Sequence, residues 1–159
     1  MVGEEGAGFI TAMKGLDRGR LHISGVRVGV AERLIGDALE YAMQRKQFGQ
    51  PISEQQLIQA MFADSQTETY AAKCMTLETA RKRDNGENVS TESSACKLFA
   101  TEMVGRVADR CLQIHGGAGY MSEYAVERFY RDVRLFRLYE GTSQIQQLII
   151  ARNMIKSAG

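Results

Sequence analysis

Proline occurs only once in these 159 residues, at Pro51. Proline breaks helices because its ring removes a backbone donor and clashes with the preceding turn. A chain that almost lacks it is therefore suited to long, uninterrupted helices. Stretches of strictly alternating apolar and polar residues, which indicate half-buried strands, are also missing. We predict an all-α fold, an antiparallel up-down helical bundle that forms a single domain over residues 1–159.

Apolar residues recur at helical spacing, as at Val30, Leu34 and Ile35 in the first long segment. This periodicity predicts three long helices, a short helix and a terminal helix. A loop over Arg134–Gly141 should precede the terminal helix, and Met1–Lys14 should form a flexible entry and a short helical turn. The expected helices cover Leu16–Gln47, Ser53–Arg83, Ser90 up to the glycine turn Gly116–Gly119, Glu123–Asp132 and Thr142–Lys156.

Local signals suggest where these helices begin and end. Asp17 suits the start of the first helix. The segment Phe48-Gly49-Gln50-Pro51 contains two stop signals and should end it. Ser53 and Gln56 have the spacing of a capping box, in which each side chain bonds the backbone of the other residue.

Composition narrows the classes of function. The net charge is +1, from 20 basic and 19 acidic residues, so nothing calls for a nucleic acid or an anionic membrane as partner. No apolar run approaches the roughly 18 residues of a membrane span, and Met1–Phe9 does not resemble a signal peptide. The three cysteines and two histidines show no metal-ligand spacing. We expect no metal, and we expect the cysteines to be buried, reduced thiols.

Glu140 is the most informative carboxylate, because it precedes the start of the expected terminal helix. Gly141 beside it gives backbone freedom, and Thr142 or Ser143 can cap the helix. From spacing alone, the simpler interpretation is that Glu140 complements the positive end of the helix dipole. A catalytic role is the alternative.

Four motifs, in order along the chain, carry a resemblance to a known family. They are Leu16-Asp17-x-x-Arg20, then Arg45-Lys46-Gln47-Phe48-Gly49, then Gln113-x-x-Gly116-Gly117-x-Gly119-Tyr120, and Tyr139-Glu140-Gly141-Thr142-Ser143-Gln144. Together they resemble the carboxy-terminal domain of acyl-CoA dehydrogenases over nearly the whole chain. The resemblance implies that the family's amino-terminal helical domain and middle β-domain are absent from this sequence.

The resemblance implies FAD as cofactor and assigns a role to each matching residue. Glu140 takes the place of the catalytic base. Arg20, Tyr139 and Gly141 match positions near the substrate. The positions that match cofactor contacts are Arg45, Gln47, Phe48, Gln56, Gln113, Gly116, Gly117, Thr142 and Gln144. Arg45–Phe48 and Gln113–Gly117 match regions that reach the flavin of a neighbouring subunit. Some relatives carry the base just before the arginine of the first motif, where this chain has Gly19, which cannot act as a base.

The implied reaction is oxidation of an acyl-CoA to its trans-2-enoyl form, with electrons passing to an electron-transfer flavoprotein. A homodimer or homotetramer is expected, located in the cytoplasm of a bacterium or the mitochondrial matrix of a eukaryote. The isolated chain is expected to be inactive. Two alternatives remain open: an oxidase-like or monooxygenase-like flavoenzyme of the same superfamily, and a non-catalytic helical module for oligomerisation.

Overall fold

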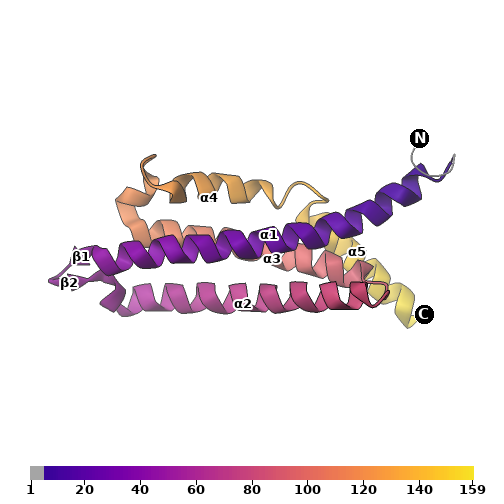
Figure 1. Cartoon of the computed structure of the whole chain (residues 1–159), viewed down its shortest axis with the longest axis horizontal. Helices are drawn as coiled ribbons and strands as arrows, with labels where there is room; N and C mark the ends of the chain where they lie inside the picture. The colour runs from indigo at the N-terminus through magenta and orange to yellow at the C-terminus, as the bar shows by residue number, and fades with distance from the viewer. Residues whose placement is uncertain (1–5) are drawn as a thin grey trace.

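The computed structural model describes residues 6–159, without the side chains of Ile10, Lys14 and Asp17. It contains five α-helices within those residues, and the prediction of an all-α helical bundle is confirmed (Figure 1). The helices are α1 (Gly8–Gln44), α2 (Gln56–Asp84), α3 (Ser90–His115), α4 (Ala125–Leu135) and α5 (Ser143–Ala158). The smaller elements are the strands β1 (Lys46–Gln47) and β2 (Gln50–Pro51) and the 3-10 helices η1 (Ile52–Glu54) and η2 (Gly116–Tyr120).

Helix α3 lies at the centre of the bundle. It contacts α1, α2, α4 and α5, and thirteen of its residues are buried. In Figure 1, α1 and α2 run side by side along the length of the molecule, while α4 and α5 lie on other sides of α3. A helix enclosed in this way must be apolar, or internally satisfied, on most of its surface.

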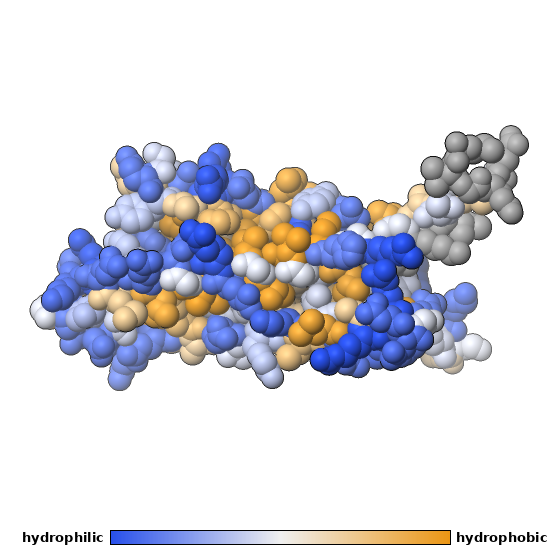
Figure 2. All heavy atoms as spheres, viewed as in Figure 1, coloured by the Kyte–Doolittle hydropathy of each residue, from blue (hydrophilic) through white to orange (hydrophobic). Residues whose placement is uncertain are grey.

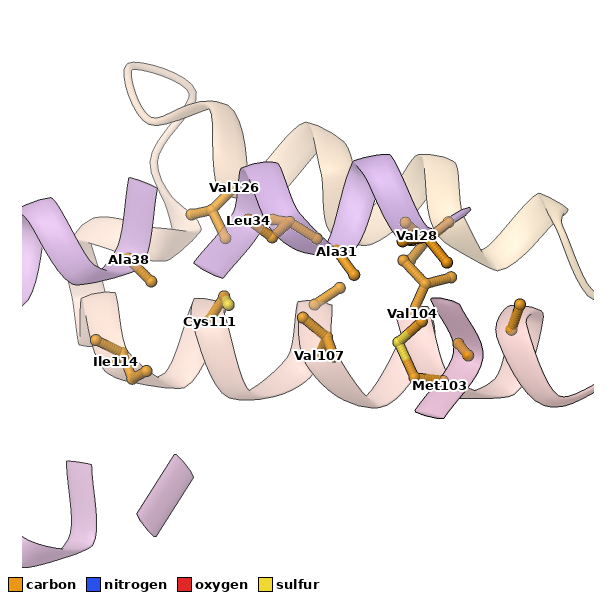
Figure 3. Packing of buried hydrophobic residues seen from close by; sticks show 14 of the residues in the cluster. Val28, Ala31, Leu34, Ala38, Met103, Val104, Val107, Cys111, Ile114 and Val126 are labelled. Atoms are coloured by element: carbon orange, nitrogen blue, oxygen red, sulfur yellow. The ribbon is translucent and has the colours of Figure 1, made fainter. Parts of the chain in front are cut away.

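The interface of α1 with α3 forms the main part of the core. Figure 3 shows Val28, Ala31, Leu34 and Ala38 of α1 facing a row on α3 that includes Val104 and Val107. Several positions are alanine, which allows the two backbones to approach closely. Some of the hydroxyl groups buried on α3 and its neighbours donate to the carbonyl four residues earlier, as Thr101 does to Lys97 and Ser24 to Arg20. These two hydroxyls are thereby satisfied inside the bundle, whereas those of Ser93 and Ser94 are buried without a hydrogen-bond partner among the described residues.

The ends of α1 differ from the prediction. The helix begins at Gly8 rather than Leu16, so Asp17 lies within it. The expected flexible entry over Met1–Lys14 is therefore wrong from Gly8 onward, and its residues 1–5 lie outside the described residues. Helix α1 ends at Gln44 rather than Gln47, because residues 46–51 form a small antiparallel hairpin in which Lys46 pairs with Pro51 and Gln47 with Gln50.

The expected capping box is also wrong. Ser53 lies in η1, and α2 begins at Gln56 after Gln55, which makes no side-chain cap. Pro51 starts the 3-10 turn that takes up the residues expected to open α2. By contrast, α3 begins at Ser90 and is ended by Gly116, as expected. Helix α4 begins two residues later than predicted and ends three residues later.

Two of the three cysteines fit the expectation of buried thiols. Burial raises the pKa of Cys96, and raises that of Cys111 to about 12, so both thiols stay protonated and unreactive. Cys74 is exposed, so the prediction is wrong for that residue. Over the described residues 6–159, no group of three His, Cys, Asp or Glu side chains could hold a metal ion, and no helix has the length and apolarity to cross a membrane.

We predict that Leu34→Ala destabilises the chain by about 2–5 kcal/mol, because Leu34 is fully buried between α1 and α3 and its truncation leaves a cavity. Leu57→Ala is the matched control, since Leu57 is 79% exposed at the start of α2. Urea unfolding followed by circular dichroism measures both. Equal effects of the two substitutions would show that the α1–α3 interface is not the core.

Candidate active site

The Glu140 carboxylate lies against α1 at a glycine. A Cβ atom placed on Gly19 would come within 2.9 Å of Glu140 Oε2, closer than side chains tolerate. Gly19 therefore leaves the space that the carboxylate occupies. Glu140 Oε2 is buried and accepts no hydrogen bond within the described part of the chain. Residues 19 and 140 are far apart in sequence, and the fold brings them into contact.

The loop that carries Glu140 joins α4 to α5 and contains two residues in the left-handed region. Glu140 has φ 57° and Gly141 has φ 84°. Glycine adopts this conformation freely, whereas a side chain such as that of Glu140 costs roughly 1–2 kcal/mol there. Such a backbone persists only where surrounding contacts fix it.

Those contacts come from α3 and α5. Gln146 Nε2, fully buried on α5, donates to the carbonyl oxygens of Glu140 and Gly141, each at 3.1 Å. Lys97 Nζ, fully buried on α3, donates to the Gly141 carbonyl oxygen at 2.6 Å. As expected, Thr142 caps α5, because its hydroxyl accepts from the Ile145 amide at 3.3 Å.

The ends of the loop are held by a second acidic group, Glu102 on α3. Its carboxylate accepts a hydrogen bond from the Ser143 hydroxyl at 2.7 Å and forms an ion pair with Arg137 at 3.2 Å. Gly105, one turn further along α3, leaves room for the Arg137 guanidinium, which would collide with any Cβ there. The segment 137–143 is thus fixed to α3 at both ends.

Arg27 connects the loop to α1. Its guanidinium donates to the hydroxyl of Tyr139 and to the carbonyl of Ile23, and its central carbon lies 3.5 Å from the centre of the Phe136 ring. Stacking on an aromatic face suits the weakly hydrated guanidinium. Burial lowers the pKa of Arg27, and the hydrogen bond with Tyr139 opposes that shift.

The charges near Glu140 are mainly positive. Arg20 is buried on α1, and Lys97 lies near it. Burial, followed by the charge of Arg27, lowers the pKa of Lys97 to about 8. Arg20 acts in the same direction, whereas Glu102 and Glu140 oppose the shift.

A second set of predicted site residues lies at another end of the bundle, around the hairpin on the left of Figure 1. An open pocket of about 450 Å³ there is lined by Arg45, Gln47, Gly116 and Gly117, among others. The Arg45 side chain makes no hydrogen bond or ion pair with any described residue. Gln113 is exposed in the last turn of α3, and Gln56 is exposed at the start of α2. Neither lines this pocket.

Phe48 occupies the tip of the hairpin in an unusual state. Its side chain is 93% exposed, and its φ of 54° precedes the φ of 83° at Gly49. Two positive φ values form the type of turn that joins two short antiparallel strands.

The predicted site residues therefore form two groups. Arg20, Tyr139, Glu140, Gly141 and Thr142 belong to the loop between α4 and α5, the candidate base loop, and to the part of α1 next to it, with Gln144 exposed on the first turn of α5. The remaining residues surround the hairpin or flank it. Sequence reasoning missed the three groups that hold the loop, Lys97, Glu102 and Gln146. A lysine within the apolar segment Ala95-Cys96-Lys97-Leu98-Phe99 was the available signal for the first of them.

Comparison with known proteins matches this arrangement to one family. A family model described as the carboxy-terminal domain of acyl-CoA dehydrogenase matches residues 6–155. The chain belongs to the acyl-CoA dehydrogenase family. Butyryl-CoA dehydrogenase from Megasphaera elsdenii has the same fold, with a TM-score of 0.94 and 36% identity over 96% of this chain and 40% of that one.

Two relatives of this acyl-CoA dehydrogenase domain are described as reductases. The 3-(aryl)acrylate reductase of Clostridium sporogenes is 45% identical over 156 residues, which cover 98% of this chain and 41% of that protein. A subunit of the caffeyl-CoA reductase-Etf complex of Acetobacterium woodii is 44% identical over 155 residues, with coverages of 98% and 41%. The chain thus spans about two fifths of the length of these relatives.

We predict that Gly19→Ala and Gly25→Ala have different effects on stability. Both glycines lie within α1, where alanine is favoured by roughly 0.5–1 kcal/mol. A Cβ on Gly25 meets nothing within 4 Å, so Gly25→Ala should stabilise the chain. A Cβ on Gly19 meets the Glu140 carboxylate, so Gly19→Ala should gain nothing or lose stability. Thermal unfolding of both variants measures this difference, and equal gains would place Glu140 away from α1.

Proposed function

We propose that this chain supplies the catalytic base and part of the flavin site of an FAD-dependent acyl-CoA dehydrogenase, which oxidises acyl-CoA to trans-2-enoyl-CoA. The observation that carries the proposal is the Glu140 carboxylate itself. It lies beside Gly19 with a buried oxygen that accepts no hydrogen bond within the described residues. An oxygen in this state has a lone pair available for a proton, and its loop is fixed from two helices.

In the proposed reaction, Glu140 removes the α-proton of the acyl thioester and holds it on the carboxylate. FAD, when bound, supplies the acceptor for the hydride that leaves the β-carbon. The α-proton is weakly acidic, so the base must be close, well aligned and shielded from water. The fixed backbone at Glu140 and Gly141 would provide the alignment, and Tyr139 would line the acyl pocket beside it.

The residues around the hairpin fit a dinucleotide cofactor. Arg45 is exposed without a partner among the described residues and lines the same open pocket as Gly116 and Gly117. A guanidinium with free donors suits phosphate oxygens, and a glycine pair lets backbone approach a ligand. Phe48, exposed at the tip, is suited to contact the cofactor of a neighbouring subunit. Thr142 and Gln144 would approach a flavin from the side of the base loop.

A homo-oligomer is proposed because the site residues are divided between the Glu140 loop and the hairpin, which would serve the cofactors of different subunits. Large apolar side chains are exposed on α5 and the preceding loop, including Leu138, Leu148 and Ile155. Figure 2 shows hydrophobic residues along the middle of one face, bordered by hydrophilic ones. Such surfaces favour association between copies. An electron-transfer flavoprotein is the proposed electron acceptor.

The reductases among the relatives favour a second candidate, the same chemistry in reverse. In that direction a protonated Glu140 gives its proton to the α-carbon of an enoyl-CoA while the β-carbon receives a hydride. Assays of the complete enzyme with acyl-CoA and an oxidised acceptor, and with enoyl-CoA and a reduced donor, distinguish the two directions. A rapid reaction with oxygen would instead indicate an oxidase.

We predict that Glu140→Gln in the complete enzyme lowers kcat by on the order of 10³-fold or more, because the amide has nearly the same shape but cannot accept the proton. Flavin content should not change. Glu78→Gln is the control, since Glu78 is exposed on α2, where it pairs with Arg81. Steady-state kinetics and the flavin absorbance measure both effects, and near-normal turnover of Glu140→Gln would exclude this base.

We predict that the 159-residue chain alone shows no tight, saturable binding of FAD. The contacts proposed for Arg45 and Phe48 lie on an exposed hairpin, and exposed ion pairs contribute little in water and salt. Fluorescence titration of FAD into the purified chain measures this. A submicromolar dissociation constant would contradict a site shared between subunits and domains.

A further inference from the structure

Lys97 is a fully buried cation that the proposed reaction does not use. It lies on α3 with an exposed fraction of 0%. Removing an ammonium group from water is costly unless other groups compensate. Here the only hydrogen-bond acceptor within the described residues is a neutral one, the Gly141 carbonyl at 2.6 Å. A residue retained at such a cost calls for a role other than stability.

The hydrogen bond from Lys97 reaches the part of the loop whose backbone has positive φ angles. Gly141 and Glu140 are both in the left-handed region, which a glutamate adopts only under constraint. Gln146 also donates to the Gly141 carbonyl, so this oxygen receives donors from α3 and α5. Fixing this peptide unit restrains the Gly141 backbone, and Gln146 also holds the Glu140 carbonyl, so together these donors limit the directions open to the Glu140 side chain.

We propose that Lys97 is the positioning residue of the base loop, because its bond to the Gly141 carbonyl holds the Glu140 backbone so that the carboxylate stays beside Gly19. The catalytic significance of this role rests on the proposed function of Glu140, whereas the role itself is a property of the chain. Lys97 touches the loop and no reacting atom.

The charges around Lys97 make this anchor sensitive to pH. Arg20 and Arg27 face it from α1, Glu102 shares α3 with it, and Glu140 faces it from the loop. From α5, the neighbouring group on the carbonyl is Gln146, which does not titrate. The two arginines and burial favour loss of the lysine proton near pH 8, below the ordinary range of lysine. A neutral amine is a weaker donor than an ammonium group, so the anchor should weaken as pH rises through this value.

Stability should change in the opposite sense. The pKa of Lys97 is lower in the folded chain than in the unfolded chain, so between about pH 8 and 10.5 the unfolded state binds more protons. Folding is therefore favoured as pH rises through that window, while the loop anchor is lost.

The first test uses the 159-residue chain alone and NMR spectroscopy. The amide shifts of Glu140 and Gly141 should titrate with a midpoint near pH 8 in the wild type and should not titrate in Lys97→Met. Methionine keeps the length of the side chain but removes its charge and donors. Lys73→Met is the matched control, since Lys73 is exposed on α2 and pairs with Glu32, and it should leave the titration unchanged.

The second test uses the complete enzyme. Lys97→Met should lower kcat by on the order of 10²-fold, as expected for a misplaced catalytic group, with flavin content and KM almost unchanged. The alkaline change in kcat near pH 8 should disappear in this variant. Lys73→Met should behave like the wild type in all respects.

The outcomes separate this inference from the proposed function. If the wild-type enzyme acts on no acyl-CoA or enoyl-CoA, the proposed function fails, and the NMR titration still decides whether Lys97 controls the loop. If the enzyme is active but Lys97→Met has normal kcat and the same pH profile, the positioning role is wrong. Wild-type amide shifts of Glu140 and Gly141 that do not titrate near pH 8 would overturn it as well, even if Lys97→Met did not fold.

Discussion

The enclosure of α3 by the other four helices is the constraint on which the structure depends. Most of α3 faces other helices, so the polar residues that it buries must find partners inside the bundle. Toward its carboxyl end, α3 meets this requirement with apolar residues such as Val107 and Cys111, which pack against α1. Toward its amino end it carries Lys97 and Glu102, whose partners lie in the loop between α4 and α5. One helix thus provides both the core and the support of the candidate base.

The sequence predicts two kinds of residue, the apolar positions of the helices and the residues of local motifs. Periodic apolar positions such as Leu34 and Val104 predicted the helices and most of the core, because helical spacing is a local property. The motif around Glu140 indicated the family, which is confirmed, and predicted a catalytic role for Glu140, although spacing alone favoured a simple helix-end charge. Thr142 as the cap of α5 was also a local signal and was confirmed.

The features that sequence reasoning missed depend on contacts between distant residues. The close approach of Gly19 to Glu140 and that of Lys97 to Gly141 each join segments that local periodicity cannot relate. The early end of α1 had a different cause. Gly49 and Pro51 have the character of helix stop signals, but they belong to a hairpin. The first strand of this hairpin, Lys46–Gln47, occupies the residues expected to form the last turn of α1. Glycine and proline are compatible with a helix end and with a hairpin turn. The pairing of Gln47 with Gln50 shows that this segment is a hairpin.

The position of that hairpin bears on how a complete site is built. Figure 1 places it at one end of the bundle, while the loop between α4 and α5 lies toward the other. In the proposed function, Glu140 meets the substrate next to the reactive ring of a flavin, so Arg45 and Phe48 of the same chain would not contact the ring beside their own Glu140. They are suited either to the distant, phosphate-bearing part of an extended dinucleotide or to the cofactor of another copy. Phe48, exposed and held at positive φ, can bury its ring only against another molecule or another domain. The separation of the two groups along the bundle therefore supports a site assembled from more than one chain, in which α3 keeps the distance between the two groups constant.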